Sequence, residues 1–131
     1  MLLDSSAWIE FLRATGSPPH LAVRQLLHTP DSLIVCEPVA MEVVAGARSE
    51  QHAIELQRLL ARGTLVATEP TDWVDAARIY RTGRRRGLTV RKLIDCLIAA
   101  IALRIDESVL HHDADFDAIA QLVPLHVTRK L

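Results

Sequence analysis

The chain has 131 residues, of which 50% are hydrophobic and 24% are charged, and its formal net charge is −1. A chain of this length buries roughly two thirds of its unfolded surface, so we expect a single domain over residues 1–131. The charge balance argues against binding nucleic acid through a uniformly basic surface, and no apolar run approaches the ~18 residues of a membrane span. The opening MLLDSS lacks the basic region and apolar core of a signal peptide, so we expect a cytoplasmic protein.

Five short apolar runs are separated by longer helical patterns. The runs cover residues 2–3, 32–35, 64–67, 108–110 and 125–127. Strands that alternate with helices indicate an α/β fold with a mainly parallel sheet.

The helical patterns begin at residues that favour helix starts. We expect helices over residues 18–27 and 38–47, each opened by a proline suited to the first turn. Ser49 can cap a helix that ends near Gly63, and Thr71 can cap the next one.

Two pairs of residues have simple structural explanations. Trp73 and Tyr80 lie seven residues apart on one helix face, where core or dimer contacts are more common than base stacking. Cys36 and Cys96 fit no metal or redox spacing, so we expect both in the core.

Residues 93–103, LIDCLIAAIAL, are apolar except for Asp95. The segment contains no glycine or proline and predicts a helix that is buried on nearly every side. An ionised carboxylate is costly to bury without a partner. Asp95 therefore needs a hydrogen-bond donor, a cation or a functional site.

Three other acids are expected near Asp95. Ligands of parallel sheets gather beyond the carboxyl ends of the strands, and Asp4 and Asp113 follow the first and fourth apolar runs. Glu42 interrupts the apolar helix over 38–47 as Asp95 interrupts its own, and both have small residues on the same helix face. This leaves room for an ion or a phosphate beside each carboxylate.

The four acids together favour a metal site. Clustered carboxylates repel and raise one another's pKa unless a divalent cation neutralises them. Oxygen ligands without cysteine suit one or two Mg²⁺ or Mn²⁺ ions rather than zinc, and such sites hydrolyse phosphodiester bonds. Taken singly, each acid has a simpler explanation, because it could cap a turn or pair with an arginine.

Four segments resemble those of PIN-domain nucleases, and especially of VapC-type toxins from bacterial toxin-antitoxin pairs. They are MLLDSSAWIEFLR, AMEVVAGA, KLIDCLIAAIAL and VLHHDADFDAIA, in the family's order and over nearly the whole chain. The resemblance implies a three-layer fold with a central five-stranded parallel sheet, and an endoribonuclease that cleaves cellular RNA with Mg²⁺ or Mn²⁺. It also implies a homodimer and a cognate VapB-type antitoxin, which we expect to send a basic side chain among the acids.

The resemblance also assigns the acids. By position, the family's four acids match Asp4, Glu42, Asp95 and Asp113, which makes them the expected catalytic residues and metal ligands. Asp115 matches a further acid of many such toxins, where it is placed to hold a second ion.

Substrate contacts are expected from a hydroxyl, a histidine and a basic cluster. Ser6 matches the hydroxyl that orients the first acid, whereas His111 departs from the Thr or Ser of many relatives and could donate to an acid or a phosphate. Arg84, Arg85 and Arg86 could guide RNA phosphates toward the metal. Equally, they could form a solvated helix end whose charge complements the helix dipole.

Two other functions fit part of the pattern. A phosphoacceptor receiver domain also gathers acids beyond a parallel sheet, but it needs a lysine there, and neither Lys92 nor Lys130 is expected near the acids. A PIN-fold scaffold without catalysis would not need the complete set of acids, and a nuclease assay with Mg²⁺ separates it from an enzyme.

Overall fold

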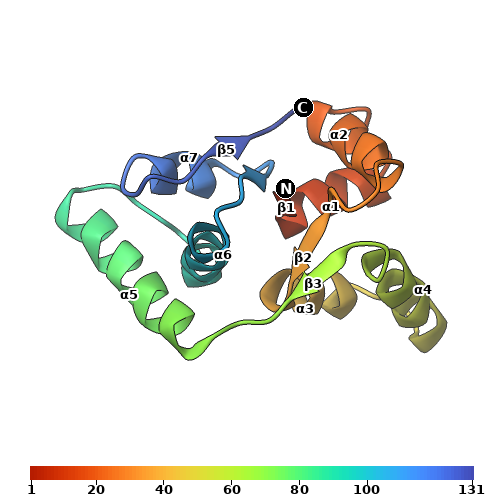
Figure 1. Cartoon of the computed structure of the whole chain (residues 1–131), viewed down its shortest axis with the longest axis horizontal. Coiled ribbons are helices and arrows are strands. Elements are labelled where there is room, and N and C mark those ends of the chain that lie inside the picture. The colour runs from red at the N-terminus through yellow and green to blue at the C-terminus, as the bar shows by residue number, and fades with distance from the viewer.

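The computed structural model describes residues 1–131 as a five-stranded sheet flanked by seven helices (Figure 1). The strands are β1 (Leu2–Leu3), β2 (Ile34–Cys36), β3 (Thr64–Val66), β4 (Val109–Leu110) and β5 (Val127–Thr128). The helices are α1 (Ser5–Leu12), α2 (Pro18–Leu27), α3 (Glu37–Ala45), α4 (Glu50–Leu60), α5 (Pro70–Arg85), α6 (Leu93–Arg104) and α7 (Ala114–Ala120). The strand order is β3-β2-β1-β4-β5 and every neighbouring pair is parallel, which confirms the expected fold class.

The helices lie in two groups on either side of the sheet. The chain runs from β1 through β2 to β3 at one edge, and then returns past β1 to β4 and β5. Right-handed crossovers in opposite directions place helices on opposite faces, and Figure 1 shows α1 to α4 on one side and α5 to α7 on the other. The direction reverses between β1 and β4, so the carboxyl ends of these strands form the crevice where open parallel sheets bind ligands.

The core is built on the central strands and on α6. The fully buried residues of β1 and β4 are Leu2, Leu3, Val109 and Leu110. In α6, residues 95–102 are all buried, and the exposed residues are the first and the last, Leu93 and Arg104. Cys36 and Cys96 are buried and unpaired, as expected of core residues. No helix, α6 included, combines the length and the apolar character that a membrane span requires.

The helix starts confirm one predicted cap and correct another. The Ser49 side chain accepts from His52 N at 3.1 Å and caps α4 as expected. The predicted cap at Thr71 is wrong, because α5 begins at Pro70 and its N-cap is Glu69, two residues before Thr71. The Asp72 carboxylate accepts from Glu69 N at 2.8 Å, which closes the first turn.

Two strands pair later than their apolar runs predict. Leu33 and Leu125 are buried, but the paired registers of β2 and β5 start at Ile34 and Val127. An apolar pattern indicates which residues are buried. In these two segments the first buried residue comes before the first residue that pairs with a neighbouring strand.

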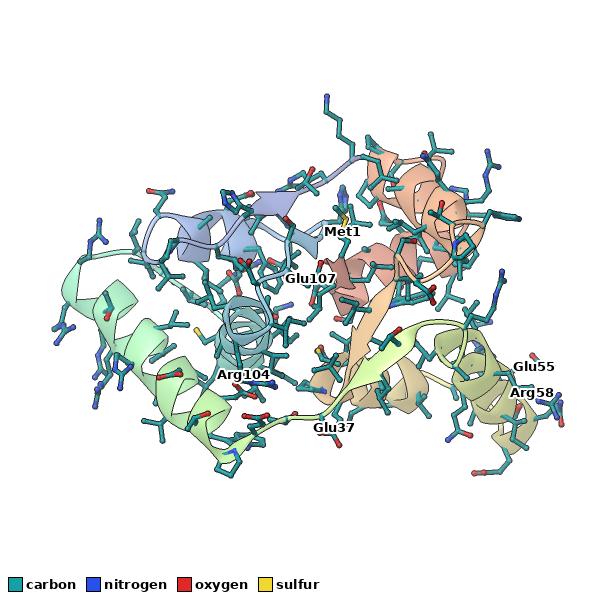
Figure 2. All side chains as sticks on the ribbon, in the orientation of Figure 1. Met1, Glu37, Glu55, Arg58, Arg104 and Glu107 are labelled. Carbon is teal, nitrogen blue, oxygen red and sulfur yellow. The ribbon has the colours of Figure 1, made fainter.

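The first residue fastens β1 at the middle of the sheet. The Met1 ammonium donates to Ser32 O at 2.9 Å and lies 2.8 Å from Glu107 Oε2 (Figure 2). These contacts join the start of β1 to the segments that precede β2 and β4, its two neighbours. The start of β1 is therefore fixed relative to the segments that lead into both neighbouring strands.

Candidate metal centre

The four expected acids all lie near the carboxyl ends of the central strands. Asp4 follows β1 directly and caps α1, and Asp113 follows β4 and caps α7. Glu42 lies on α3, which begins where β2 ends, and Asp95 lies in the first turn of α6. The sheet thus brings together residues that are far apart in the chain.

Asp4 is held by Ser6 and is completely buried. Its Oδ2 accepts from Ser6 N at 3.0 Å and also from the Ser6 hydroxyl. The same hydroxyl oxygen accepts from His112 N at 2.8 Å, so Ser6 joins the segments that follow β1 and β4. Ser6 therefore has the orienting contact expected of it. Burial raises the pKa of Asp4 even with these donors in place.

Asp95 is buried and Glu42 is half-buried, and the fold leaves both acids poorly paired. Asp95 is 1% exposed, and burial, with the charge of Asp4 as the next cause, raises its pKa to about 8. Burial and then the Asp4 charge also raise the pKa of Glu42. Both raised pKa values indicate that this group of carboxylates has too little positive charge around it.

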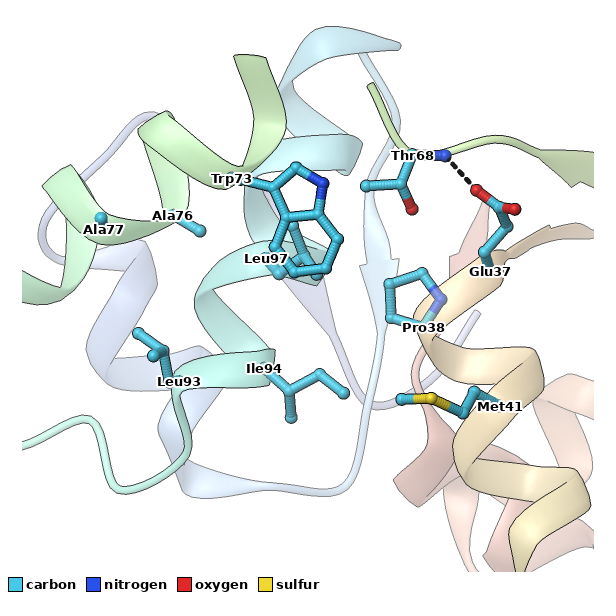
Figure 3. A pocket seen from close by; sticks show the side chains of 10 residues that line it. All are labelled: Glu37, Pro38, Met41, Thr68, Trp73, Ala76, Ala77, Leu93, Ile94 and Leu97. Atoms are coloured by element: carbon cyan, nitrogen blue, oxygen red, sulfur yellow. Dashed lines mark hydrogen bonds between the residues drawn. The ribbon is translucent and has the colours of Figure 1, made fainter. Parts of the chain in front are cut away.

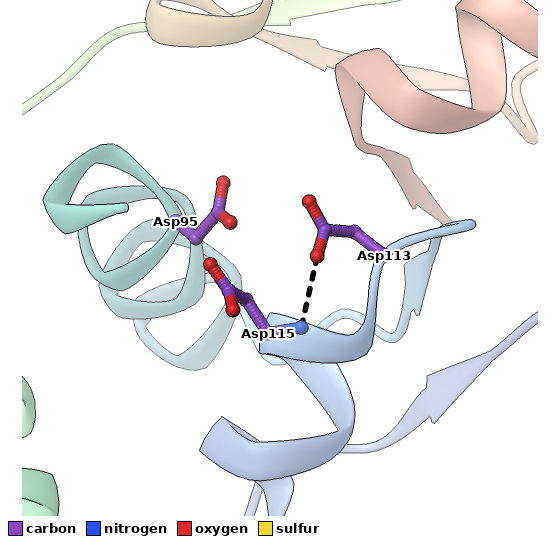
Figure 4. Close-up of side chains that lie close together, drawn as sticks. All are labelled: Asp95, Asp113 and Asp115. Atoms are coloured by element: carbon purple, nitrogen blue, oxygen red, sulfur yellow. Dashed lines mark hydrogen bonds between the residues drawn. The ribbon is translucent and has the colours of Figure 1, made fainter. Parts of the chain in front are cut away.

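Asp113 and Asp115 complete the cluster. Asp113 Oδ1 accepts from Asp115 N at 2.9 Å, which turns both side chains toward Asp95 (Figure 4). Asp95, Asp113 and Asp115 each offer an oxygen such that these atoms all lie within 4.8 Å of one another. Asp115 thus joins the acids as the sequence predicts, and the closest grouping contains Asp115 rather than Asp4 or Glu42.

Arg91 and Lys92 lie among the acids, and the expectation that no lysine does so is wrong. Lys92 Nζ lies 2.6 Å from Asp113 Oδ2 and 3.6 Å from Asp95 Oδ2. Arg91 reaches Asp113 Oδ1 through Nη2 and Asp115 Oδ1 through Nε, both at 3.1 Å. Burial opposes the charged form of Asp113, but the hydrogen bonds from Lys92 and Asp115 N and the charges of Lys92 and Arg91 together outweigh it, so the pKa of Asp113 is lowered.

The sequence does contain a signal that Lys92 lies near Asp95. Lys92 stands three residues before Asp95, a spacing that places two side chains on one helix face. Its presence removes the earlier objection to a receiver domain, but the strand order excludes that fold. Receiver domains have the order 2-1-3-4-5, whereas this sheet has β3-β2-β1-β4-β5.

His111 lies beneath the loop that carries Asp113. It is completely buried, and its Nδ1 accepts from Asp113 N at 3.1 Å. Its Nε2 lies 3.4 Å from Asp117 Oδ1 without forming a hydrogen bond. Burial lowers the pKa of His111, so the ring is neutral near pH 7. The contact supports the loop, and the ring offers no exposed edge to a phosphate.

The basic cluster Arg84 to Arg86 lies at the end of α5 and is exposed. Arg85 donates to Thr82 Oγ1 at 3.2 Å and Arg86 donates to Gln121 O at 3.3 Å. The cations paired with the acids are Arg91 and Lys92. A role of the cluster in guiding RNA stays a prediction.

An apolar groove of about 660 Å³ lies between α3, α5 and α6 (Figure 3). Met41, Trp73 and Leu93 line it and are 62%, 60% and 57% exposed. Glu37 accepts from Thr68 N at its rim (Figure 3). Trp73 is therefore a surface residue. Of the two positions expected for it, the core is excluded, and a dimer contact stays a prediction.

Three buried carboxylate oxygens have no hydrogen-bond partner: Asp4 Oδ1, Glu42 Oε1 and Asp95 Oδ2. Buried polar atoms are nearly always paired, so three unpaired acceptors in one crevice need an explanation. A hard divalent cation binds carboxylate oxygens. The donor set therefore fits Mg²⁺ or Mn²⁺.

Comparison with known proteins gives the family. The PIN domain model matches residues 1–122, and two curated relatives are each 45% identical over 127 residues, 95% of both chains. They are VapC ribonuclease Mb1587 of Mycobacterium bovis and ribonuclease VapC11 of Mycobacterium tuberculosis. The chain belongs to the VapC group of the PIN domain family.

The fold of this VapC-type chain also matches solved structures. DNA-bound VapBC from Salmonella typhimurium aligns with a TM-score of 0.77 at 19% identity, over 97% of this chain and 95% of that one. At this identity the match shows the fold alone. It agrees with the resemblance of the four sequence segments.

Proposed function

We propose that this VapC-type ribonuclease is a metal-dependent endoribonuclease that hydrolyses phosphodiester bonds of cellular RNA. The observation that carries the proposal is the set of unpaired buried oxygens on Asp4, Glu42 and Asp95. The names of the two ribonuclease relatives support the same reaction.

The acids would hold Mg²⁺ or Mn²⁺, with Asp4 and Asp95 as the principal ligands. A bound divalent cation supplies a water of lowered pKa and charge that stabilises the leaving oxygen. Ser6 keeps the Asp4 carboxylate in one orientation through two hydrogen bonds. His111 keeps the loop of Asp113 in place. Arg91, whose side chain is exposed, is the cation at the rim that suits a substrate phosphate.

We also propose that the chain is the toxin of a toxin-antitoxin pair, inhibited when a VapB-type antitoxin sends a basic side chain among the acids. The DNA-bound VapBC complex from Salmonella supports the choice of partner. The contacts of Arg91 with Asp113 and Asp115 support the chemistry, since a guanidinium already bridges two acids at this site.

A homodimer is the proposed assembly. Contiguous exposed apolar surface typically marks a protein contact. The groove lined by Met41, Trp73 and Leu93 offers such surface beside the acidic crevice, on the helix that carries Asp95.

The decisive experiment is cleavage of cellular RNA by the purified chain with Mg²⁺ and with excess chelator. We expect cleavage only with the metal, and a loss of about 1,000-fold, equal to ~4 kcal/mol of barrier, in Asp4→Asn and Asp95→Asn. Asp75→Asn is the matched control, because Asp75 is a half-exposed acid on α5 that pairs with Arg78.

Two results would contradict the proposal. Unchanged cleavage in excess chelator would exclude a metal mechanism. Absence of cleavage by a folded chain with Mg²⁺, over a wide range of RNAs, would favour the non-catalytic scaffold.

A further inference from the structure

The five acids of the site fall into two halves that the fold treats differently. The first half consists of Asp4, Glu42 and Asp95, and each of these has a buried oxygen without a hydrogen-bond partner. The second half consists of Asp113 and Asp115, whose oxygens receive donors from the chain itself. The need for an added cation is therefore confined to the first half.

The donors of the second half come from two consecutive residues. Arg91 bridges Asp113 Oδ1 and Asp115 Oδ1, each at 3.1 Å. Lys92 donates its backbone N–H to Asp115 Oδ2 at 3.1 Å and places its ammonium 2.6 Å from Asp113 Oδ2. Every carboxylate oxygen of Asp113 and Asp115 thus has a donor or a cation.

The Lys92 ammonium also lies where a second ion would bind. Asp95, Asp113 and Asp115 are the acids whose oxygens come closest together. Lys92 Nζ contacts Asp113 Oδ2 and lies 3.6 Å from Asp95 Oδ2, so it stands between two of these acids. A divalent ion bound by all three would have to displace this ammonium or bear its repulsion at close range.

We propose that Arg91 and Lys92 take the place of a second metal ion, so that this chain binds one divalent ion, on the Asp4, Glu42 and Asp95 half of its site. The inference rests on the proposed metal dependence and adds the number of ions. Two-metal nucleases place ions about 4 Å apart between shared carboxylates. Here fixed side-chain cations neutralise the acids that such a second ion would use.

The test is Mn²⁺ titration of the metal-free chain, by calorimetry for stoichiometry and by electron paramagnetic resonance for coupling between ions. For the parent we expect one Mn²⁺ per chain and the spectrum of an isolated ion. For Lys92→Met, which keeps a long side chain without its charge, we expect two Mn²⁺ per chain and the spectrum of a coupled pair. Lys130→Met is the matched control and should keep one ion, since Lys130 has no contact with the acids.

The outcomes separate this inference from the proposed function. Two ions in the parent, or a single ion that merely binds more tightly in Lys92→Met, would overturn the inference and leave the metal-dependent nuclease intact. No Mn²⁺ binding by the folded parent would overturn both. If Lys92→Met does not fold, Lys92→Gln gives the same comparison, and two ions in the parent overturn the inference without any variant.

Discussion

Two buried aspartates occupy the same position in two helices and have opposite surroundings. Asp72 and Asp95 are the third residues of α5 and α6, and each is 1% exposed. Asp72 accepts from Arg104 Nε at 2.9 Å and Nη2 at 3.0 Å, and from Glu69 N at 2.8 Å (Arg104 is labelled in Figure 2). Asp95 Oδ2 has no hydrogen bond, and its nearest cation, Lys92 Nζ, is 3.6 Å away.

The pKa values of the two carboxyl groups move in opposite directions. Burial opposes the charged form of both, but at Asp72 the hydrogen bonds from Arg104 and Glu69 N, together with the Arg104 charge, outweigh it and the pKa is lowered. At Asp95 burial dominates, and the pKa rises to about 8. Asp72 therefore serves the fold, whereas Asp95 is kept charged only when a further cation binds, as is common at functional sites.

Breaking the Asp72 pair should give the largest effect on stability. Asp72→Asn removes the charge opposite Arg104 and should lower the free energy of unfolding by about 3 kcal/mol, measured by urea denaturation. Asp75→Asn, in an exposed pair with Arg78 on the same helix, should change it by less than about 0.5 kcal/mol. Equal effects of the two substitutions would refute a structural role for Asp72.

The pH dependence of metal-free stability should sharpen the contrast. An unfolded aspartate titrates near its ordinary pKa of 3.8, and folded Asp95 near 8. Between these values the folded state binds the additional proton. The stability of the chain therefore falls as pH rises through this window, by up to ~1.4 kcal/mol per pH unit.

The contribution of Asp72 to stability changes with pH in the opposite direction. Its lowered pKa means that its contribution is present above the ordinary aspartate range and is lost as pH falls through the lowered value. Urea denaturation in chelator, from about pH 5 to about pH 8, should show a shallower decline for Asp95→Asn than for the parent. Parallel declines in the two proteins would show that Asp95 does not titrate in this window.

The sequence contains enough information for the fold and for the acids. Strands alternating with helices predict the parallel sheet, and the acids after β1 and β4 are placed by chain order alone, because parallel strands end at one edge. Asp95 is conspicuous as the one charged residue among apolar neighbours, and its burial is confirmed.

The partners of the acids were not predictable in the same way. Arg104 pairs with Asp72 over 32 residues, and Arg91 pairs with Asp113 over 22. Such pairs depend on how helices pack, which no local pattern reports. The nature of each partner decides whether a buried acid stabilises the fold or binds a ligand, so sequence spacing alone could not distinguish Asp72 from Asp95.

The most direct test of the central claim is a set of thermal melts of the parent and Asp95→Asn, each with chelator and with Mg²⁺. Asn keeps the shape of the side chain and cannot take up the charge that the metal-free site disfavours, while Lys92 retains its contact with Asp113. With chelator at neutral pH, we expect the variant to be as stable as the parent or more stable by about 1 kcal/mol. Added Mg²⁺ should raise the melting temperature of the parent more than that of the variant. A marked loss of metal-free stability in Asp95→Asn would contradict the account and show that the carboxylate serves the fold.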